Sequence, residues 1–342
     1  MTAAEPKSPA HARALVTGCA GFIGSHLVER LLADGTTVLG VDSFTNFYAR
    51  EIKKANIHAF RDHPAFELRR LDLSRDSITG LLNGVDVVYH LAGQPGVRGS
   101  FGTSFRTYAR HNIEATQRLL EEAVQSPIQA FVFASSSSVY GDDVPTPTRE
   151  DVATTPLSPY GMTKIAAEQL AGVYFRSHGI PVLGLRYFSV YGPRQRPDMA
   201  LSRFIGQLVI GRPITVYGAG HQTRDFTYVD DVVEGTLRAA ERGRPGAIYN
   251  IGGGHPVELL DAIEQLGEIL DRPVDIQWLP AVPGDVATTA ADVSLARKEL
   301  GFRATTKLKH GLKAQVKAAL HDLPRLKRRT RRWHTQAGDA AA

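Results

Sequence analysis

Cysteine is almost absent from this chain of 342 residues, in which Cys19 is the single thiol. One cysteine cannot form an internal disulfide or anchor a cysteine-rich metal site, so both kinds of cross-link are excluded. A chain that folds without disulfides is typical of a reducing compartment. We therefore expect a cytoplasmic protein with no metal centre.

Long apolar segments are also lacking. No run of about 18 apolar residues is present, which argues against a membrane-spanning helix. The opening stretch MTAAEPKSPAHARA contains no apolar segment of the length that a signal peptide needs. Because 43% of the residues are hydrophobic and 22% are charged, the composition is that of a globular protein. We expect a soluble chain without a membrane partner, long enough for two domains.

Acidic residues are fewer than basic ones, and the formal net charge is +5. Six basic residues lie near the C-terminus, and taking six charges from +5 leaves −1; they are Arg325, Lys327, Arg328, Arg329, Arg331 and Arg332. A basic tail can bind nucleic acid or an anionic membrane, but no groove-reading motif accompanies this one. We interpret it as a solvated tail and expect no nucleic-acid partner.

Short apolar segments alternate with amphipathic segments from residue 13 onward. The apolar segments predict strands at residues 14–17, 37–41, 66–71, 85–89, 130–134 and 181–187. The amphipathic segments predict helices at residues 23–33, 77–82, 108–125 and 160–177. Apolar strands that alternate with helices indicate βαβ units and a parallel sheet buried on both faces. The predicted fold class is therefore α/β, with a doubly wound parallel sheet.

The alternation ends after residue 187, where shorter apolar segments follow at 214–217, 248–251 and 274–278 among turns rich in glycine and proline. This change predicts a second, smaller α/β domain that binds the substrate. We predict a first domain of residues 12–188 with about 225–250, and a second of about 189–224 with 251–322. Residues 1–11 and 323–342 would be tails.

Three glycines follow the first predicted strand, in the stretch VTGCAGFIG at residues 16–24. The spacing G-x-x-G-x-x-G permits a tight turn, close approach of the backbone to a pyrophosphate, and close packing of helix on strand. The free N–H groups of the following helix would face the phosphates. The stretch predicts a dinucleotide site in a Rossmann-type domain, and the expected contacts are Gly18, Gly21, Phe22, Ile23 and Gly24.

Asp42 ends the second predicted strand, 18 residues after Gly24, where a carboxylate can accept hydrogen bonds from the adenosine ribose. Neither Ser43 nor Phe44 is an arginine that would bind a 2′-phosphate, so NAD is favoured over NADP. Further cofactor contacts are expected where the third and fourth strands end, at Asp72, Leu73, Leu91, Ala92 and Gln94. His90 is either a packed structural histidine or a ligand contact.

A tyrosine and a lysine stand four residues apart in Tyr160-Gly161-Met162-Thr163-Lys164. On a helix this spacing puts both side chains on one face, where the ammonium would lower the phenol pKa from about 10. Such a tyrosine can accept a proton from a sugar hydroxyl as hydride leaves for nicotinamide. Hydroxyl groups would enter the same crevice from the serine run that follows the fifth strand, Ser135, Ser136, Ser137 and Ser138.

Together these motifs resemble the extended short-chain dehydrogenase/reductase superfamily, and in particular its nucleotide-sugar epimerases, from about Ala12 to about His321. The resemblance implies that Ser136 relays a proton, that Tyr160 is the base, and that Lys164 is its partner. It also implies a tightly bound, recycled NAD, and a homodimer built on the helices at 108–125 and 160–177. The further cofactor contacts that it implies are Ser43, Asn46, Asn112, Ser135 and Tyr187.

Two stretches resemble UDP-glucuronate 4-epimerases: RYFSVYGPRQRPDMA at residues 186–200 and QPGVR at 94–98. A sugar carboxylate needs hydroxyl donors and a cation, which Ser137, Ser138, Ser189 and Arg196 could supply. The stretch QTRDFTYVDD at 222–231 resembles the diphosphate and ribose segment of these enzymes. The remaining substrate contacts implied are Arg98, Tyr217, Arg224 for phosphate and Asp285 for the uridine ribose. Gly93 and Pro95 depart from this family's pattern, which has alanines there.

The two residues after Ser136 indicate which reaction the chain catalyses. Sugar dehydratases of this fold carry acidic residues there and decarboxylases carry a glutamate, whereas this chain has Ser137 and Ser138. Epimerisation at C4 of UDP-glucuronate, through a transient 4-keto sugar, is therefore the main hypothesis. The alternatives are a 4-epimerase of a neutral sugar (UDP-glucose or UDP-N-acetylglucosamine), a dehydratase or decarboxylase, and a non-catalytic NAD sensor. The last is disfavoured because Tyr160 and Lys164 are both present.

Overall fold

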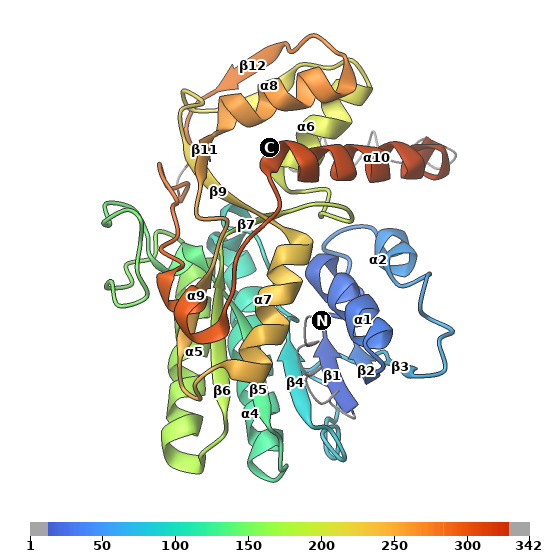
Figure 1. Cartoon of the computed structure of the whole chain (residues 1–342), viewed down its shortest axis with the longest axis vertical. Helices are drawn as coiled ribbons and strands as arrows, with labels where there is room; N and C mark the ends of the chain where they lie inside the picture. Colours follow the sequence, from blue (N-terminus) through green and yellow to red (C-terminus); the bar gives the residue numbers. More distant parts are fainter. Residues whose placement is uncertain (1–12, 283, 328–342) are drawn as a thin grey trace, which may run out of the picture.

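The larger part of the chain is a parallel sheet with helices on both faces, in a computed structural model that describes residues 13–282 and 284–327 (Figure 1). Its seven strands lie in the order β10-β6-β5-β4-β1-β2-β3. They are β1 Arg13–Thr17, β2 Thr37–Val41, β3 Phe66–Arg69, β4 Val87–His90, β5 Ala130–Ser136, β6 Val182–Tyr187 and β10 Ile248–Ile251. The α/β fold class and the doubly wound sheet are thus confirmed.

The order of the strands reverses at β1. The chain runs from β1 outward through β2 and β3, and then returns to place β4 on the opposite side of β1. In an open parallel sheet such a reversal leaves a crevice at the carboxyl ends of the strands, because the two connecting segments leave β1 in opposite directions. The crevice therefore opens beside Thr17 and His90, the last residues of β1 and β4.

The sheet separates two apolar layers. Helices α1 (Phe22–Ala33), α7 (Val229–Arg242) and α9 (Ser294–Leu300) pack on one face, and α4 (Ala115–Val124) and α5 (Pro159–His178) on the other. Successive strand residues point to opposite layers: Val16 joins the first core and Leu15 the second. This double burial explains why β4 and β6 consist entirely of buried residues.

Helix α5 begins and ends where its sequence contains the usual signals. The Ser158 hydroxyl accepts a hydrogen bond from the Gly161 N–H at 3.1 Å, and Pro159 occupies the first turn. Gly179 ends the helix with a φ of 70°, in the left-handed region that glycine adopts without strain. The predicted helix at 160–177 is confirmed to within two residues.

The second part of the chain has its own core between short sheets and helices. One sheet has the order β11-β9-β7, and a second pairs β12 with β8. The elements are β7 Ser189–Tyr191, α6 Ala200–Val209, β8 Ile214–Tyr217, β9 Thr223–Tyr228, β11 Pro256–Glu258, α8 Leu259–Leu270, β12 Ile276–Leu279 and α10 Leu308–Lys327. Figure 1 shows these elements above the carboxyl edge of the large sheet. They therefore cover the crevice from one side.

Helices α7 and α9 belong by contact to the large sheet. α7 packs against α1, and α9 packs against α7 and β10. We therefore propose the domain division stated above with residues 294–300 moved to the first domain. Most of the two predicted tails, including Arg328, Arg329, Arg331 and Arg332, lies outside the described residues.

The sequence expectations and the structure differ in three local details. Residues 77–82 form turns rather than a helix, because Gly80 adopts a φ of 72°, although Ile78, Leu81 and Leu82 remain buried. The helix expected at 108–125 is divided into α3 (Phe105–Tyr108), a π-helical segment Ala109–Glu114, and α4. Helix α2 (Arg50–Asn56) was not predicted, since it is short.

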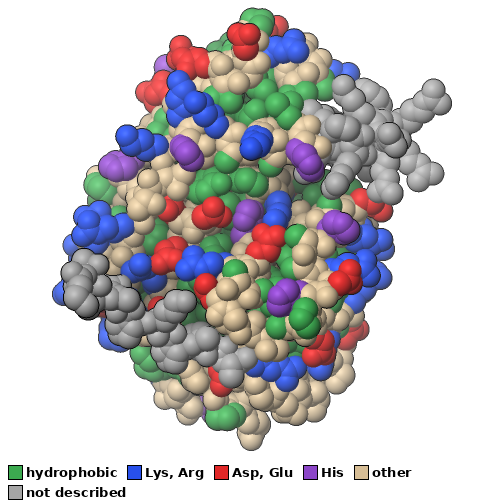
Figure 2. Space-filling view, turned by 45° about the vertical axis from the view of Figure 1, so that its right-hand side comes forward, with side chains coloured by type: hydrophobic (Ala, Val, Ile, Leu, Met, Phe, Trp, Pro, Cys, Tyr) green, Lys and Arg blue, Asp and Glu red, His purple; other side chains and the backbone are tan. Residues whose placement is uncertain are grey.

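The surface shows charges of both signs. On the face drawn in Figure 2, Lys and Arg side chains are interspersed with Asp and Glu, and no large area of one sign is visible. Within residues 13–282 and 284–327, no helix combines the length and the apolar character needed to cross a membrane.

Candidate active site

A cavity of about 470 Å³ lies at the carboxyl edge of the large sheet, under the second part of the chain. Its walls come from the ends of β1, β2, β4, β5 and β6, and from segments around residues 189, 224 and 285. Cavities of roughly 300–1,000 Å³ are usual for small-molecule sites. The position agrees with the crevice that the strand order creates.

The glycine turn at one end of the cavity leaves no room for side chains. A Cβ on Gly24 would lie 2.2 Å from the Gly18 carbonyl oxygen, and one on Gly18, whose φ is +71°, would lie 2.9 Å from the Ala92 nitrogen. Gly21 precedes the first turn of α1, and Phe22, Ile23 and Gly24 line the cavity. Backbone N–H groups at a helix N-terminus bind anions, so the pyrophosphate of a dinucleotide fits this end.

Asp42 lines the cavity at the end of β2 and is held by the backbone around it. One carboxylate oxygen accepts a hydrogen bond from the Phe44 N–H at 2.7 Å, the other from the Ala20 N–H at 3.2 Å, and Asp42 is 7% exposed. The buried Lys53 ammonium lies 3.7 Å from Asp42 and donates to Thr45 at 3.2 Å. Sequence reasoning missed Lys53, because it stands on the unpredicted helix α2.

Asp72 and His111 line the next section of wall, with 3.8 Å between a carboxylate oxygen and Nε2 of the ring. Burial acts to raise the pKa of Asp72, but hydrogen bonds from Ser74 outweigh it, and the pKa is lowered. Burial lowers the pKa of His111. An ionised carboxylate beside a neutral histidine can accept a hydrogen bond from an adenine amino group.

His90 is structural. Its Nδ1 lies 2.8 Å from the Thr17 hydroxyl, and its Nε2 lies 3.0 Å from the Thr116 hydroxyl. Burial lowers its pKa to about 3, so the ring is neutral at ordinary pH. Since both ring nitrogens have partners, His90 has no atom left for a ligand, and the structural alternative holds.

Ser136, Tyr160 and Lys164 meet on the cavity wall where β5 ends beside α5. The Lys164 ammonium lies 5.9 Å from the centre of the Tyr160 ring and donates to the Ala134 carbonyl oxygen at 2.9 Å. Burial lowers the pKa of Lys164 to about 8, with Glu168 opposing the shift. The cluster therefore contains an ammonium group that titrates near neutral pH.

The expected fall in the pKa of Tyr160 is wrong for the protein by itself. Burial raises this pKa above its usual range, while hydrogen bonding with Ser136 and the charge of Arg196 act against the shift. Lys164 does not offset the burial, since its ammonium donates to a carbonyl oxygen of β5 instead of to the phenol. The spacing predicted the shared helix face correctly but could not reveal this competing acceptor.

Three hydroxyl groups and one guanidinium also line the cavity, at Ser137, Ser138, Ser189 and Arg196. The Arg196 fork is already engaged: Nε and Nη2 donate to the two carboxylate oxygens of Asp198, at 3.0 and 2.9 Å. Arg196 thus has the geometry for a carboxylate. A carboxylate that enters the cavity would compete with Asp198 for the same donors.

Arg224 and Asp285 line the cavity from the second part of the chain. The Arg224 Nη1 donates to the Thr223 carbonyl oxygen at 2.8 Å, and burial lowers the pKa of this guanidinium. Asp285 accepts from Arg98 Nη2 at 2.6 Å, and the Arg98 guanidinium lies 4.1 Å from the centre of the Tyr217 ring. This wall combines cationic and acidic groups, as a nucleoside diphosphate requires.

Most predicted site residues line this one cavity; those that do not are Asn46, Asn112, Arg98 and Tyr217. Arg98 contacts the wall through Asp285, and the Tyr217 ring packs against Arg98. The Asn112 amide is used entirely inside the protein: its oxygen accepts from the Gln94 N–H at 2.6 Å, and its nitrogen donates to Gln94 and Thr163. Asn112 therefore joins the Gln94 loop to α5 from behind the wall.

Sequence reasoning missed several wall residues. They include Thr45, Phe47, Tyr48, Lys53, His111, Leu157, Ser158, Phe188, Val190, Met199, Val286 and Thr289, together with four loop residues, Pro95, Gly96, Val97 and Gly284. Only adjacency to known motifs could have indicated Phe188, Val190 and Met199, which lie within the RYFSVYGPRQRPDMA stretch. Among residues 13–282 and 284–327, no group of three His, Cys, Asp or Glu side chains is arranged to bind a metal.

A Rossmann-type sheet with a glycine turn for a dinucleotide, followed by a serine, tyrosine and lysine beside the same cavity, defines the extended short-chain dehydrogenase/reductase class. Within this class, the profile of the NAD dependent epimerase/dehydratase family matches residues 14–252. The chain belongs to that family.

Similar proteins act on UDP-sugars. The crystal structure of UDP-glucuronic acid 4-epimerase from Bacillus cereus, in complex with UDP-glucuronic acid and NAD, superposes with a TM-score of 0.88 at 42% identity, covering 90% of this chain and 99% of that one. A Bacillus subtilis (strain 168) protein named "Uncharacterized UDP-glucose epimerase YtcB" is 44% identical over 306 residues, 88% of this chain and 96% of its own length. The UDP-glucuronate 4-epimerase of Thermodesulfobacterium geofontis is 36% identical over 307 residues, covering 88% and 94%.

We predict that Gly24→Ala weakens NAD binding by about tenfold or more, a free-energy loss of at least about 1.4 kcal/mol. The new Cβ would lie 2.2 Å from the Gly18 carbonyl oxygen, so the turn must open. Alanine is otherwise favoured over glycine inside a helix. NAD content after purification and calorimetric titration with NAD measure the effect.

Gly206→Ala in α6 is the matched control, because no atom lies within 4 Å of the Cβ it would add. This variant should bind NAD like the unmodified protein. Normal NAD content in Gly24→Ala would contradict the assigned phosphate cradle.

Proposed function

We propose that this chain is an NAD-dependent 4-epimerase that interconverts UDP-glucuronate and UDP-galacturonate through a transient 4-keto sugar. The observation that carries the proposal is the juxtaposition in one cavity of Tyr160 and Lys164 with the Ser137 and Ser138 hydroxyls and the Arg196 guanidinium. The first pair suits proton transfer at a sugar hydroxyl, and the other three groups suit a sugar carboxylate. The similarity to the Bacillus cereus UDP-glucuronic acid 4-epimerase supports the same substrate.

The cofactor fits the glycine end of the cavity. Gly18, Gly21 and the first turn of α1 would hold the pyrophosphate, and Asp42 would accept the adenosine ribose hydroxyls. When bound, NAD supplies a hydride acceptor and a positive charge near the reacting sugar. Because epimerisation has no net redox change, we propose that NAD stays bound and is recycled.

Proton transfer is assigned to the cluster at the end of β5. Tyr160 accepts the proton of the C4 hydroxyl through or beside Ser136, which lines the same wall, and later returns it. Burial disfavours the charged phenolate, so positive charge is needed near it. Lys164 and Arg196 are the cationic residues of the cavity wall next to Tyr160, and we propose that both contribute to this stabilisation.

The serines protect the intermediate. A 4-keto uronic acid is a β-keto acid, which loses carbon dioxide when the bond to its carboxylate aligns with the carbonyl π-system. Hydrogen bonds from Ser137, Ser138 and Ser189, with a bidentate contact from Arg196, would hold that bond out of alignment. Neither serine after Ser136 offers the carboxyl group that a dehydratase or decarboxylase uses.

The competing function is 4-epimerisation of a neutral UDP-sugar. Two observations favour it: the similarity to the Bacillus subtilis protein named as a UDP-glucose epimerase, and the engagement of Arg196 by Asp198. If Arg196 stays with Asp198 when the sugar binds, it gives an acidic sugar no advantage. The two functions therefore differ in what Arg196 contacts.

We also propose that the enzyme is a cytoplasmic homodimer. Met162 and Val173 on α5 are 52% and 47% exposed. Their separation of 11 residues corresponds to about three helical turns, which places both on one face. That exposed apolar face supports a dimer through α5 and α4. The lone, buried Cys19 supports a reducing compartment.

Proton NMR of the purified protein with UDP-glucuronate, and without added NAD, tests the proposed function. We expect a new anomeric signal of galacto configuration, because the cofactor is expected to be retained during purification. Turnover of UDP-glucose alone, with the acid unchanged even after NAD is added, would establish the neutral-sugar function instead. A UDP-pentose signal would show that the carboxylate is not protected.

We predict that Tyr160→Phe lowers kcat by about 10²–10⁴-fold, because the phenylalanine ring cannot accept a proton. NAD binding should persist, since the glycine turn and Asp42 are unchanged. Initial rates by NMR and NAD content measure the two effects separately. Normal turnover would remove Tyr160 from its assigned role, and loss of NAD would mean that the variant disturbs the fold.

We predict that Arg196→Ala raises the KM for UDP-glucuronate by about 10–100-fold, the effect of a lost charge-assisted hydrogen bond of roughly 1.5–3 kcal/mol. The KM for UDP-glucose should change much less. Arg149→Ala is a matched control, because Arg149 also pairs with an aspartate two residues on, but outside the cavity. A fall in kcat shared by both sugars fits the proposed role of Arg196 beside Tyr160, whereas an equal rise in the two KM values would contradict the carboxylate contact.

A further inference from the structure

A buried ion pair lies directly behind the catalytic wall. Glu168 is the third residue of a series on one face of α5, after Tyr160 and Lys164, at successive steps of four. Its carboxylate accepts from Arg186 Nε and Nη2, at 2.9 and 2.8 Å, and the two side chains are 3% and 5% exposed. The proton transfer described above uses neither residue.

The pair contacts the cavity wall at two points. The Ser135 hydroxyl, which lines the cavity beside Ser136, donates to the Glu168 carboxylate. Arg186 immediately precedes Tyr187, another wall residue. Glu168 is therefore linked to β5 by Ser135 and to β6 by Arg186, and it stands one helical turn from Lys164.

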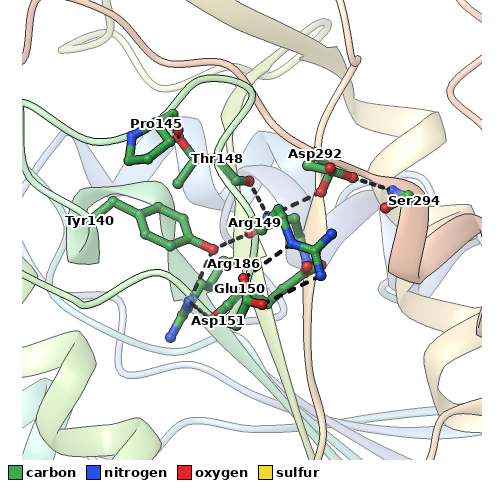
Figure 3. Close-up of polar contacts among 10 residues, drawn as sticks. Tyr140, Pro145, Thr148, Arg149, Glu150, Asp151, Arg186, Asp292 and Ser294 are labelled. Atoms are coloured by element: carbon green, nitrogen blue, oxygen red, sulfur yellow. Dashed lines mark hydrogen bonds and ion pairs between the residues drawn. The ribbon is translucent and has the colours of Figure 1, made fainter.

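The same guanidinium continues the polar contacts away from the cavity. Arg186 Nη1 donates to the Tyr140 hydroxyl at 2.9 Å (Figure 3). The Tyr140 hydroxyl in turn donates to Asn250 Oδ1 at 2.6 Å. The Asn250 amide in turn donates to the carbonyl oxygens of Thr148 and Asp292. These contacts fix the orientation of Arg186, and its bidentate contact in turn fixes the orientation of the Glu168 carboxylate.

Burying two charges is costly, and an apolar pair of similar volume would often be equally stable or more so. A gain in folding stability is therefore a poor explanation for this buried ion pair. What an apolar pair could not supply is a negative charge next to Lys164. The charge matters there because burial alone favours the neutral amine.

The surroundings of Lys164 contain little else that would keep it charged. The Ala134 carbonyl on β5 accepts its hydrogen bond, and the Asn112 amide lies nearby on the π-helical segment. His90 on β4 is neutral, because its pKa is about 3. Burial raises the pKa of Tyr160, so the phenol is also neutral before reaction. Glu168, paired with Arg186 of β6, is the carboxylate that opposes the effect of burial on Lys164.

We propose that Glu168 is a positioning residue of the reaction: oriented by Arg186, it holds Lys164 in the ammonium form and fixes the end of β5 through Ser135. The inference rests on the proposed function, since it assumes that protonated Lys164 supports Tyr160. It assigns the buried ion pair to catalysis rather than to the fold.

The pH dependence of kcat tests this inference. Burial lowers the pKa of Lys164 to about 8 while Glu168 raises it, so activity that needs the ammonium is lost as pH rises through that value. In Glu168→Gln the opposing charge is gone and the pKa falls further. The alkaline limb of the profile is the fall of kcat with rising pH. We expect it to shift to lower pH by about one unit, so that at a pH on the falling part of the profile kcat is about tenfold lower than in the unmodified protein. At lower pH, where Lys164 is protonated in both proteins, the kcat of the variant should stay within about threefold of that of the unmodified protein.

Two further variants make the result decisive. Glu168→Asp keeps the charge and should restore the limb. The double variant of Glu168→Gln with Arg186→Met leaves no unpaired buried charge, so it should fold even if Glu168→Gln alone does not. Its limb should also move to lower pH, though by less, because the Arg186 cation is removed as well. Asp151→Asn is the control, because it removes a carboxylate from the exposed Arg149–Asp151 pair shown in Figure 3.

The outcomes separate this inference from the proposed function. If the unmodified protein epimerises UDP-glucuronate but the limb of the folded variants stays in place, with kcat lowered equally at every pH, Glu168 has only a structural role and the inference is wrong. A limb that also moves in Asp151→Asn would overturn it as well. If the unmodified protein turns over no UDP-sugar, the proposed function itself has failed.

Discussion

The site depends on the contact between the Gly18 carbonyl and the backbone of Gly24. This contact lets α1 start immediately after β1 and aims the N-terminus of the helix along the crevice where the strand order reverses. A side chain at either position would separate helix from strand, and the phosphate end of the cavity would be lost. In the proposed function, the cofactor held there would set where the reacting sugar carbon lies, and hence which residues of β5 and α5 can reach it.

Burial controls the chemistry at the other end of the cavity. It raises the pKa of Tyr160 and lowers the pKa of Lys164, so both groups resist the charged forms that proton transfer requires. Because burial disfavours the charged forms, the pKa of the Lys164 ammonium falls to about 8, and nearby charges then decide how much of each charged form is present. Arg196, Glu168 and the cofactor are the sources of charge that can act there. The same groups explain why this wall contains so many buried polar contacts.

Several parts of the site could be predicted because local sequence carries them. The glycine spacing, Asp42 at a strand end, and the four-residue interval between Tyr160 and Lys164 each need only one turn or one helix face, and all three line the cavity. Lys53 and His111 could not be predicted, since they reach the cavity from α2 and from the π-helical segment, whose positions depend on packing. Asn112 resembled a cofactor contact, yet its amide is used by Gln94 and Thr163.

The sequence by itself determined the fold class, the glycine turn after β1 and the spacing of the proposed catalytic residues, because periodicity and glycine placement act over a few residues. Tertiary structure alone decided which partners those residues meet. The Lys164 ammonium donates to the Ala134 carbonyl, Arg196 pairs with Asp198, and Glu168 is buried against Arg186. Lys164 and Glu168 meet neighbouring strands of the sheet, and the Arg196 pair depends on how its loop folds at the cavity. Spacing along one segment therefore could not reveal any of these contacts.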